Sequence, residues 1–314
     1  MSPGGAGRSI LAWVLGIALL IGLVVLTHLS VGWEALLTPW KEIRPEVLGA
    51  ALGLVLGSYA VRTIRIYAYF HPATSRRFLR TFRLVLVHNL LNNLLPMRSG
   101  EASFPILMAR ELRVPFSRSI PGLVYLRVLD LHFVLLVGVA VLSWMQGNLA
   151  WLLALLLAPI PYGIFRAQEW LRPRLVDREG RISKVGREAL RGLPSTSGLF
   201  WKTWLWTAVN WTVKLVVFAW ILRAFTPMPL SFALLGSTTG ELSSVLPFHG
   251  IAGAGSYEAG VLAGLIPLGV ELESALKAAV NLHLFVLGTS ILAGAIAALF
   301  PFARKDPDER SDHS

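Results

Sequence analysis

The sequence predicts an all-α polytopic membrane protein with six full spans, two re-entrant broken-helix hairpins and two halves of inverted topology. Three observations lead to this prediction. Of the 314 residues, 54% are hydrophobic and only 15% are charged, whereas about a quarter of the residues in soluble domains are charged. Apolar segments of about 20 residues, the length that crosses a bilayer, follow one another along the chain. Two of these segments are interrupted by proline, glycine and charged residues in similar patterns.

Six apolar segments are long enough to span a bilayer. We interpret the first, 10–29, as a span because it is longer than a typical signal peptide and no convincing small-x-small cleavage site follows it. The uncharged run 133–165 is too long for one crossing, and Gln-Gly-Asn at 146–148 marks a turn between two crossings. The predicted spans are 10–29, 45–66, 119–143, 149–165, 203–225 and 274–300.

The charge distribution predicts the orientation. The chain has 29 basic and 18 acidic residues, and the basic ones gather in 62–83 and 166–202, as in cytoplasmic loops. We therefore expect a multi-pass protein of the plasma (inner) membrane with both termini in the cytoplasm, and no nucleic-acid partner. Within 166–202, an amphipathic stretch is typical of an interfacial helix on an anionic leaflet. An ordinary positive-inside loop explains the same charges equally well.

The two interrupted segments indicate an internal repeat. NNLLPMRSGE at 92–101 aligns with SSVLPFHGIA at 243–252, and DLH at 130–132 aligns with NLH at 281–283, both at a separation of 151 residues. The predicted span before the first segment runs inward, whereas the span before the second runs outward. The halves then have opposite topology, an architecture that brings two broken elements together near the membrane midplane.

The domain organisation follows from this repeat. We predict one transmembrane domain over 1–302 and a disordered cytoplasmic tail over 303–314. The first half covers about 10–143 and the second about 149–302, and a cytoplasmic linker with the interfacial helix occupies 166–202.

The interruptions themselves predict a polar cavity. Irregular backbone cannot face lipid tails, because each unsatisfied N–H or C=O group costs several kcal/mol there. Such backbone persists at membrane depth only where it is buried in protein or lines a wet cavity. We therefore expect the broken segments 84–113 and 231–269 to be re-entrant hairpins whose charged tips line one cavity.

The two motifs resemble a known family. Asn-x-x-x-Pro-x-Arg-x-Gly-Glu, from Asn92 to Glu101, and Pro-x-x-Gly-x-x-Gly-x-Gly-x-x-Glu, from Pro247 to Glu258, resemble a flippase-like integral membrane family that includes the transmembrane region of lysylphosphatidylglycerol synthases. The resemblance covers about 10–300 and implies that the two segments are paired signature loops of a lipid-handling protein. The second motif lacks the adjacent glycines that usually follow its proline, and the synthases' aminoacyl-transfer domain has no counterpart here, so lysyl transfer is not expected.

Charged residues on the first loop and in the third span are candidates for substrate binding. Arg98 is placed to contact a lipid phosphate while Glu101 balances its charge, although an ion pair that only closes the hairpin fits the same spacing. Arg127 and Asp130 lie one helical turn apart and are expected to pair. A role in binding and a purely structural role are equally compatible with that pair.

The second half supplies further candidates. Lys214 lies in the middle of a span and needs a wet cavity or an acidic partner, for which Glu241 and Glu258 are the alternatives. His88, His249 and His283 are candidates for a proton relay, because imidazole titrates near neutral pH, although most lone helix histidines are hydrogen-bonded packing residues. His249 is the exception because it aligns with Arg98. The predicted substrate-binding residues are Asn92, Asn93, Arg98, Glu101, Arg127, Asp130, Lys214, His249 and Glu258.

Three functions remain open at this point. The first hypothesis is a lipid translocase that binds an anionic headgroup, of a phospholipid or a polyprenyl-linked lipid, in a midplane cavity. The second is a membrane-embedded enzyme with Glu101 or Asp130 as general base, and the third is an accessory subunit of an envelope-lipid biosynthetic enzyme. The chain has no cysteine and no recognisable catalytic motif. We therefore expect no enzymatic activity, cofactor or metal.

Overall fold

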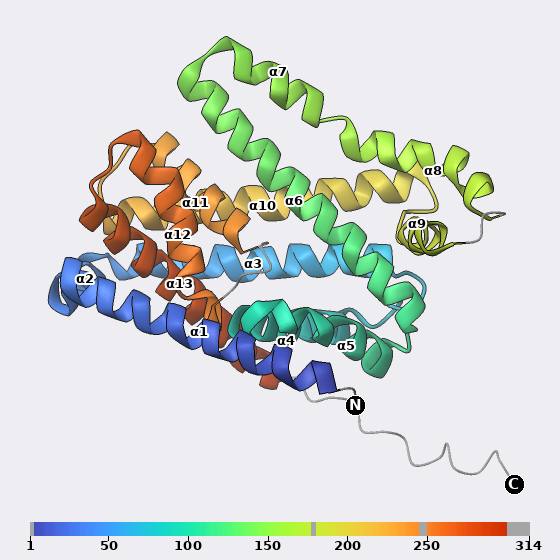
Figure 1. The fold of residues 1–314 in the computed structure, drawn as a ribbon, viewed down its shortest axis with the longest axis horizontal. Coiled ribbons are helices and arrows are strands. Elements are labelled where there is room, and N and C mark those ends of the chain that lie inside the picture. The colour runs from blue at the N-terminus through green and yellow to red at the C-terminus, as the bar shows by residue number, and fades with distance from the viewer. Residues whose placement is uncertain (1–2, 177–179, 245–249, 300–314) are drawn as a thin grey trace, which may run out of the picture.

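A computed structural model describes residues 3–176, 180–244 and 250–299, and all regular structure in these ranges is helical. The predicted all-α class is therefore confirmed. Figure 1 shows the arrangement of α1 (Pro3–Ser30), α2 (Trp33–Glu42), α3 (Pro45–Tyr69), α4 (Phe78–Leu94), η1 (Pro96–Ala102), α5 (Ser103–Leu112), α6 (Phe116–Gln146), α7 (Asn148–Leu157), α8 (Ile160–Val176), α9 (Arg181–Arg191), α10 (Ser197–Phe225), α11 (Leu230–Ser243), η2 (Ile251–Gly253), α12 (Ser256–Leu265), η3 (Ile266–Leu268) and α13 (Leu272–Ala298).

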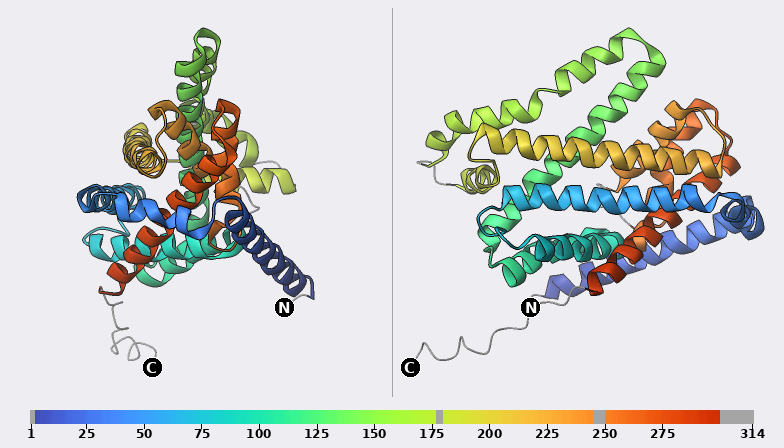
Figure 2. Two further views of the ribbon diagram at one scale, coloured as in Figure 1. Left: turned by 90° about the vertical axis from the view of Figure 1, so that its left-hand side faces the viewer. Right: turned by 180° about the vertical axis from the view of Figure 1, so that it is seen from behind.

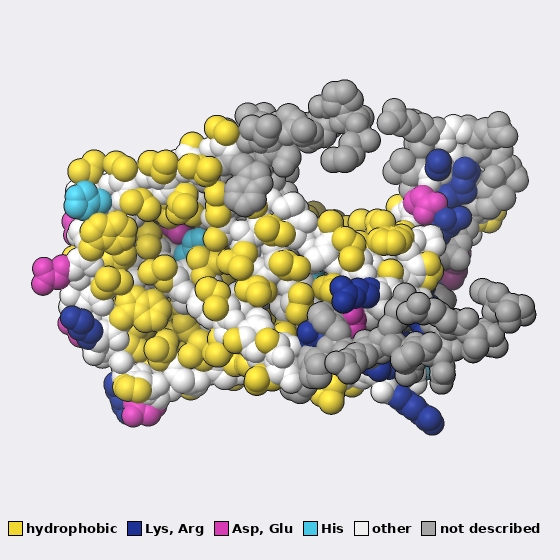
Figure 3. Space-filling view, turned by 90° about the horizontal axis from the view of Figure 1, so that it is seen from below, with side chains coloured by type: hydrophobic (Ala, Val, Ile, Leu, Met, Phe, Trp, Pro, Cys, Tyr) yellow, Lys and Arg dark blue, Asp and Glu magenta, His cyan; other side chains and the backbone are white. Residues whose placement is uncertain are grey.

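Six helical segments of the described chain are long and apolar enough to cross a membrane: Pro45–Tyr69, Phe116–Gln146, Trp151–Leu171, Ser197–Phe225, Ile251–Leu268 and Leu272–Ala298. Five of them coincide with predicted spans, and the sixth lies in the predicted second hairpin. The predicted span 10–29 falls in α1, which qualifies only together with α2, from which it is bent by 83°. Many large hydrophobic side chains face outward, and in Figure 3 they cover most of one face while charged groups gather toward its ends. The chain is a multi-pass membrane protein.

One boundary differs from the prediction. The fourth span was expected to end at 165, where the basic segment begins, but α8 continues as a helix to Val176. Residues such as Arg, Gln, Glu and Leu are good helix formers, and Arg166 pairs with Glu169 one turn later at 3.3 Å. The amphipathic stretch farther along the same segment does form a helix, α9.

Helices α3 and α10 lie side by side and run in opposite directions, as Figures 1 and 2 show. Near the end of α3, Arg65 Nη1 donates to Thr207 Oγ1 near the start of α10, at 2.7 Å. At the other end, the ring of Trp40, just before α3, lies 4.8 Å from that of Phe225, the last residue of α10. Since α4 follows α3 and α11 follows α10, the two helical hairpins enter the bundle from opposite ends.

The hairpins, α4–η1–α5 and α11–η2–α12, meet at their tips. Arg98 Nη1, on the first tip, donates to the Ser244 carbonyl oxygen on the second, at 2.8 Å. Gly100 allows η1 to lie against α4, because a Cβ there would overlap the Leu91 carbonyl. Each tip also has a non-glycine residue in the left-handed region, Arg98 at φ 54° and Ala252 at φ 53°, a conformation that is sparsely populated and concentrates at functional sites.

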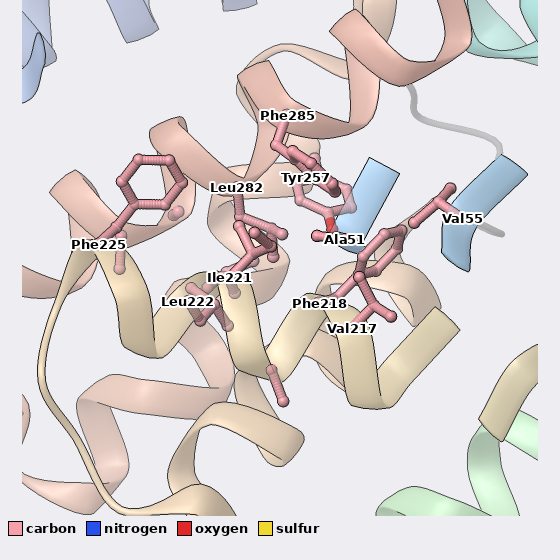
Figure 4. Close-up of a cluster of buried hydrophobic side chains, with 14 of the residues drawn as sticks. Ala51, Val55, Val217, Phe218, Ile221, Leu222, Phe225, Tyr257, Leu282 and Phe285 are labelled. Carbon is pink, nitrogen blue, oxygen red and sulfur yellow. The ribbon is translucent and has the colours of Figure 1, made fainter. Parts of the chain in front are cut away.

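A hydrophobic core joins α3, α10, α12 and α13. Figure 4 shows Val55 and Phe218 packed beside Tyr257, with Leu282 and Phe285 on the adjoining helix. All five side chains are nearly inaccessible. This core holds the second hairpin against the antiparallel pair α3–α10.

Asn281 and Trp40 form a polar contact beside this core. Trp40 Nε1 donates to Asn281 Oδ1 at 2.7 Å, and Asn281 Nδ2 donates to the Leu36 carbonyl oxygen at 2.9 Å. Asn281 is the residue that aligns with Asp130 in the predicted repeat. Its bonds fasten α13 to the α2 region, so the two aligned positions have different roles.

Candidate functional site

A polar cavity of about 80 Å³ lies between the two hairpins and the antiparallel helices. This volume has room for several water molecules. Residues far apart in the sequence line it, from α3, α4, η1, α6, α10, α11 and α13. The polar members of the lining are Tyr59, Arg62, Asn89, Asn92, Asn93, Arg98, Arg127, Asp130, Trp211, Lys214, Glu241, Ser244, Tyr257 and His283.

Asp130, on α6, is the most heavily bonded carboxylate of the site and is 3% exposed. It accepts from Arg65 at 2.6 and 3.3 Å and from Trp211 Nε1 at 2.8 Å. Arg127 donates to it at 3.4 Å. The predicted Arg127–Asp130 pair therefore exists, but the closer partner is Arg65. Such a multiply bonded carboxylate offsets buried cations and anchors α3, α6 and α10 to one another.

The location of Arg62 and Arg65 differs from the one predicted from the sequence. Both belong to the basic segment 62–83 that was predicted to be cytoplasmic, but α3 continues to Tyr69 and both side chains are buried. Two basic residues one turn apart near the end of a hydrophobic segment are typical of the cytoplasmic end of a membrane span. Here they face the interior instead, because Asp130 and the amides of α4 lie opposite.

Arg62 is the unusual member of the cluster. It is 6% exposed, and its Nη1 donates to Asn89 Oδ1 at 3.0 Å. Its Nε has no hydrogen-bond partner, and no carboxylate of the described residues forms an ion pair with it. Asn89 Nδ2 and Asn92 Oδ1 are buried without partners beside it. Unsatisfied polar atoms and a buried cation without an ion-pair partner are rare, and together they mark a place for a ligand or ordered water.

Glu101 joins two cavity arginines at the first tip. One carboxylate oxygen accepts from both Arg98 and Arg127, the latter at 2.9 Å. His88 lies close by, with Nε2 3.2 Å from Arg127 Nη2 and Nδ1 2.9 Å from Ser103 Oγ. The predicted Arg98–Glu101 pair is therefore part of a larger network that also fixes Arg127.

Lys214 is paired on the opposite side of the cavity. Its Nζ lies 3.3 Å from Glu241 Oε2 and above the rings of Trp211 and Phe218, at 4.4 and 5.1 Å from their centroids. Of the two counter-charges left open by the sequence, Glu241 is the partner. The aromatic rings add cation–π stabilisation to this buried pair.

Glu258 lies apart from the cavity. It accepts from the Gly255 N–H at 2.8 Å and contacts His283 Nδ1, while His283 Nε2 lies 2.8 Å from the Ala252 carbonyl oxygen. These bonds hold the bend of the second hairpin, and of the residues they join, His283 and Ala252 line the cavity. The glutamate instead borders an apolar pocket between α1 and α12.

The remaining predicted residues divide as follows. Asn92 and Asn93 line the cavity, and Asn93 Nδ2 also donates to Ser290 Oγ at 2.6 Å. His249, like Pro247, lies outside the described residues. Among the residues that the structure describes, no three His, Asp or Glu side chains are grouped as a metal site requires.

The charges around the cavity do not balance. Among the described residues, five basic side chains and three carboxylates line the cavity or bond directly to its lining, if the His283–Glu258 pair is counted apart. The basic residues are Arg62, Arg65, Arg98, Arg127 and Lys214, and the acidic residues are Glu101, Asp130 and Glu241. A positive excess enclosed in an apolar bundle attracts an anion far more strongly than it would in water.

An all-helical bundle that encloses charged side chains at the meeting point of two opposed hairpins defines a class, the polytopic membrane proteins with an intramembrane polar site. Residues 13–294 match the family described as the lysylphosphatidylglycerol synthase TM region, and the chain belongs to that family. No curated protein matches the sequence. Family membership connects the chain with membrane lipids and confirms the resemblance that the two loop motifs indicated.

Proposed function

We propose that this protein is a lipid translocase, which binds the phosphate of an anionic lipid headgroup in the central cavity and transfers it across the plasma (inner) membrane. The acyl chains stay in the bilayer during this movement. Membership of a lipid-related family and the positive excess of the cavity support the proposal.

Arg62 is the observation that carries the proposal. Guanidinium groups bind phosphate through paired N–H···O bonds, and they do so best where water is excluded. A phosphate beside Arg62 would satisfy its Nε and lie within the same lining as Arg98 and Arg127. The unpaired Asn89 Nδ2 would donate to a remaining phosphate oxygen, and the unpaired Asn92 Oδ1 would accept from a hydroxyl group of the headgroup.

The two hairpins suggest how the cavity changes its exposure. They enter from opposite ends of the bundle, which fits an inverted repeat with re-entrant loops, and their tips touch through Arg98 and Ser244. Movement of either hairpin against α3 and α10 would open the cavity to one side only. With the basic connections in the cytoplasm, both termini lie there too.

The same geometry disfavours an enzyme. Asp130 accepts from two arginines and a tryptophan, and Glu101 from two arginines. Carboxylates bound in this way are poor general bases, because the cations stabilise their ionised form. We therefore propose transport without a covalent step. Mass spectrometry of the lipids recovered after incubation tests this directly, since any covalently altered lipid would contradict it.

The decisive experiment compares two arginines one turn apart. Arg62→Met removes a cation without a carboxylate partner, so it should abolish scrambling of fluorescent phosphatidylglycerol in proteoliposomes and leave thermal stability unchanged or higher. Arg65→Met instead removes the main partner of Asp130, so it should lower the melting temperature. Transport by Arg62→Met at the wild-type rate would exclude the proposed phosphate site.

A further inference from the structure

A second hollow lies at the end of the bundle where α3 ends and α6 and α10 begin, beside α9. It has a volume of about 570 Å³ and shares no lining residue with the central cavity. In Figure 1 this region is at the right-hand side, where α9 lies next to the neighbouring ends of α6 and α10. We call it the α9 groove.

The lining of the α9 groove combines positive charge with apolar surface. Arg118 comes from α6, whereas Arg187 and Arg191 come from α9. None of the lining residues that the structure describes is acidic, and Leu190, Leu193, Leu199 and Pro194 form the apolar part. Glu188 pairs with Arg191 at 2.7 Å, but the side chains are 44% and 59% exposed, so this pair is weak and easily exchanged for another anion.

The groove is preformed rather than a chance gap beside a loose helix. Tyr69 Oη, at the end of α3, donates to the Gly192 carbonyl oxygen at 2.6 Å. Gly192 packs so closely on the Pro121 backbone of α6 that a Cβ would overlap it. These two contacts fix the C-terminal end of α9. Since Arg187 and Arg191 are four residues apart, they lie on one face of the helix, the face that lines the groove.

The position of the groove favours an amphiphile. Three spanning helices have an end here, and the aromatic rings of Tyr162, Trp201 and Trp204 gather around the first turns of α10. Tyrosine and tryptophan concentrate at the headgroup level of a bilayer. A ligand held here would meet arginines at its polar end and leucines along its apolar part.

We propose that the α9 groove binds an anionic phospholipid of the adjoining leaflet, with its phosphate at Arg118, Arg187 and Arg191 and the start of an acyl chain along Leu190, Leu193 and Leu199. This lipid is a resident ligand, distinct from the transported one. It links α9 to α6 and α10, so the basic segment after α8 serves as a lipid-binding element as well as a topological signal.

The test counts bound lipids by native mass spectrometry of the purified protein during titration with phosphatidylglycerol. An Arg62→Met background reduces binding in the central cavity. We expect the Arg187→Ala/Arg191→Ala double variant to bind phosphatidylglycerol about tenfold to thirtyfold more weakly, since each basic residue near a membrane surface contributes about fivefold. Lys184→Ala is the matched control, because Lys184 is an exposed base of the same helix outside the groove and should leave binding unchanged.

Gly192→Ala keeps every arginine but displaces α9 from α6, so it should weaken binding in the same direction. The proposal is overturned if the double variant binds as tightly as its parent or if phosphatidylcholine binds equally well. It is also overturned if glycerol phosphate displaces the lipid completely, because the occupant would then be a soluble anion. These binding measurements test the α9 groove, whereas the transport assay of Arg62→Met tests the central cavity. Either proposal can therefore fail without the other.

Discussion

Neutralising Glu101 should tighten anion binding in the central cavity. In the structure its carboxylate pairs with Arg98 and Arg127, two of the arginines that would bind the proposed phosphate. Both arginines retain other partners in a Glu101→Gln variant. Arg98 still donates to the Ser244 carbonyl oxygen, and Arg127 still contacts Asp130 and His88. The change therefore removes a competing negative charge without releasing the cations from their positions.

The magnitude follows from the charge and its exposure. A unit charge about 6 Å from a bound phosphate contributes roughly 3 kcal/mol at an effective dielectric constant of about 20. The side chain of Glu101 is 21% exposed, so solvent and salt reduce this repulsion by about half. About 1.4 kcal/mol remains, which corresponds to roughly tenfold tighter binding.

Isothermal titration calorimetry of the detergent-solubilised protein with dihexanoyl phosphatidylglycerol measures this affinity. Glu111→Gln is the control, because Glu111 lies at the end of the same hairpin, pairs with Arg110 and does not line the cavity. Its affinity should match that of the wild type. Weaker binding by Glu101→Gln, with an unchanged melting temperature, would show that the carboxylate positions the arginines for the ligand, and the competition argument would be wrong.

Two further substitutions test the framework of the site. Asp130→Asn leaves the buried guanidinium of Arg65 without its counter-charge, and we expect a loss of about 3–5 kcal/mol of stability, measured as a lower melting temperature in detergent. Gly100→Ala forces a methyl group into the Leu91 carbonyl; overpacking of this kind costs about 1–3 kcal/mol and should open the first hairpin to proteolysis.

Each of these substitutions has a matched control. Glu188→Gln removes one partner of an exposed ion pair with Arg191 and should change stability by less than about 1 kcal/mol. Gly57→Ala places a methyl group in open space on α3 and should be neutral or slightly stabilising, since alanine favours a helix more than glycine does. If Asp130→Asn melts at the same temperature as Glu188→Gln, the buried network is not what holds α3 to α6.

The fold was largely predictable because membrane spans have a strong signal in sequence. Twenty apolar residues have few alternatives in a bilayer, and five predicted spans coincide with helices of the structure. The ends of helices were harder to predict where the charge of a segment indicates a loop but its helix propensity favours a helix. Segment 166–176 is too basic for the hydrocarbon interior, yet it remains helical because most of its residues are good helix formers.

Only some residues of the site were predictable from the sequence, and there is a physical reason why the others were missed. Arg98, Arg127 and Lys214 were identified because each charge interrupts an apolar stretch, which a single sequence shows directly. Arg62 and Arg65 were missed because their burial depends on Asp130 and on the amides of α4, which only the fold brings opposite them. Val55, Tyr59, Arg62 and Ile66 are buried in α3 and lie three or four residues apart, on one face of the helix. This spacing was the signal in the sequence that Arg62 faces the interior.

The charges of the cavity give a physical account of an arginine that has no ion-pair partner there. Each of its other cations shares a carboxylate, through Asp130, Glu101 or Glu241. For stability alone, an apolar residue in place of Arg62 would be neutral or better, because a buried charge without a partner is costly. A buried cation that weakens the free protein strengthens its complex with an anion. A phosphate would accept from the guanidinium and from Asn89 Nδ2, whereas Asn92 Oδ1 would need a hydroxyl donor of the headgroup. If the proposed phosphate site exists, a bound phosphate would offset the positive excess, and the headgroup itself would stabilise the contact between the two hairpin tips.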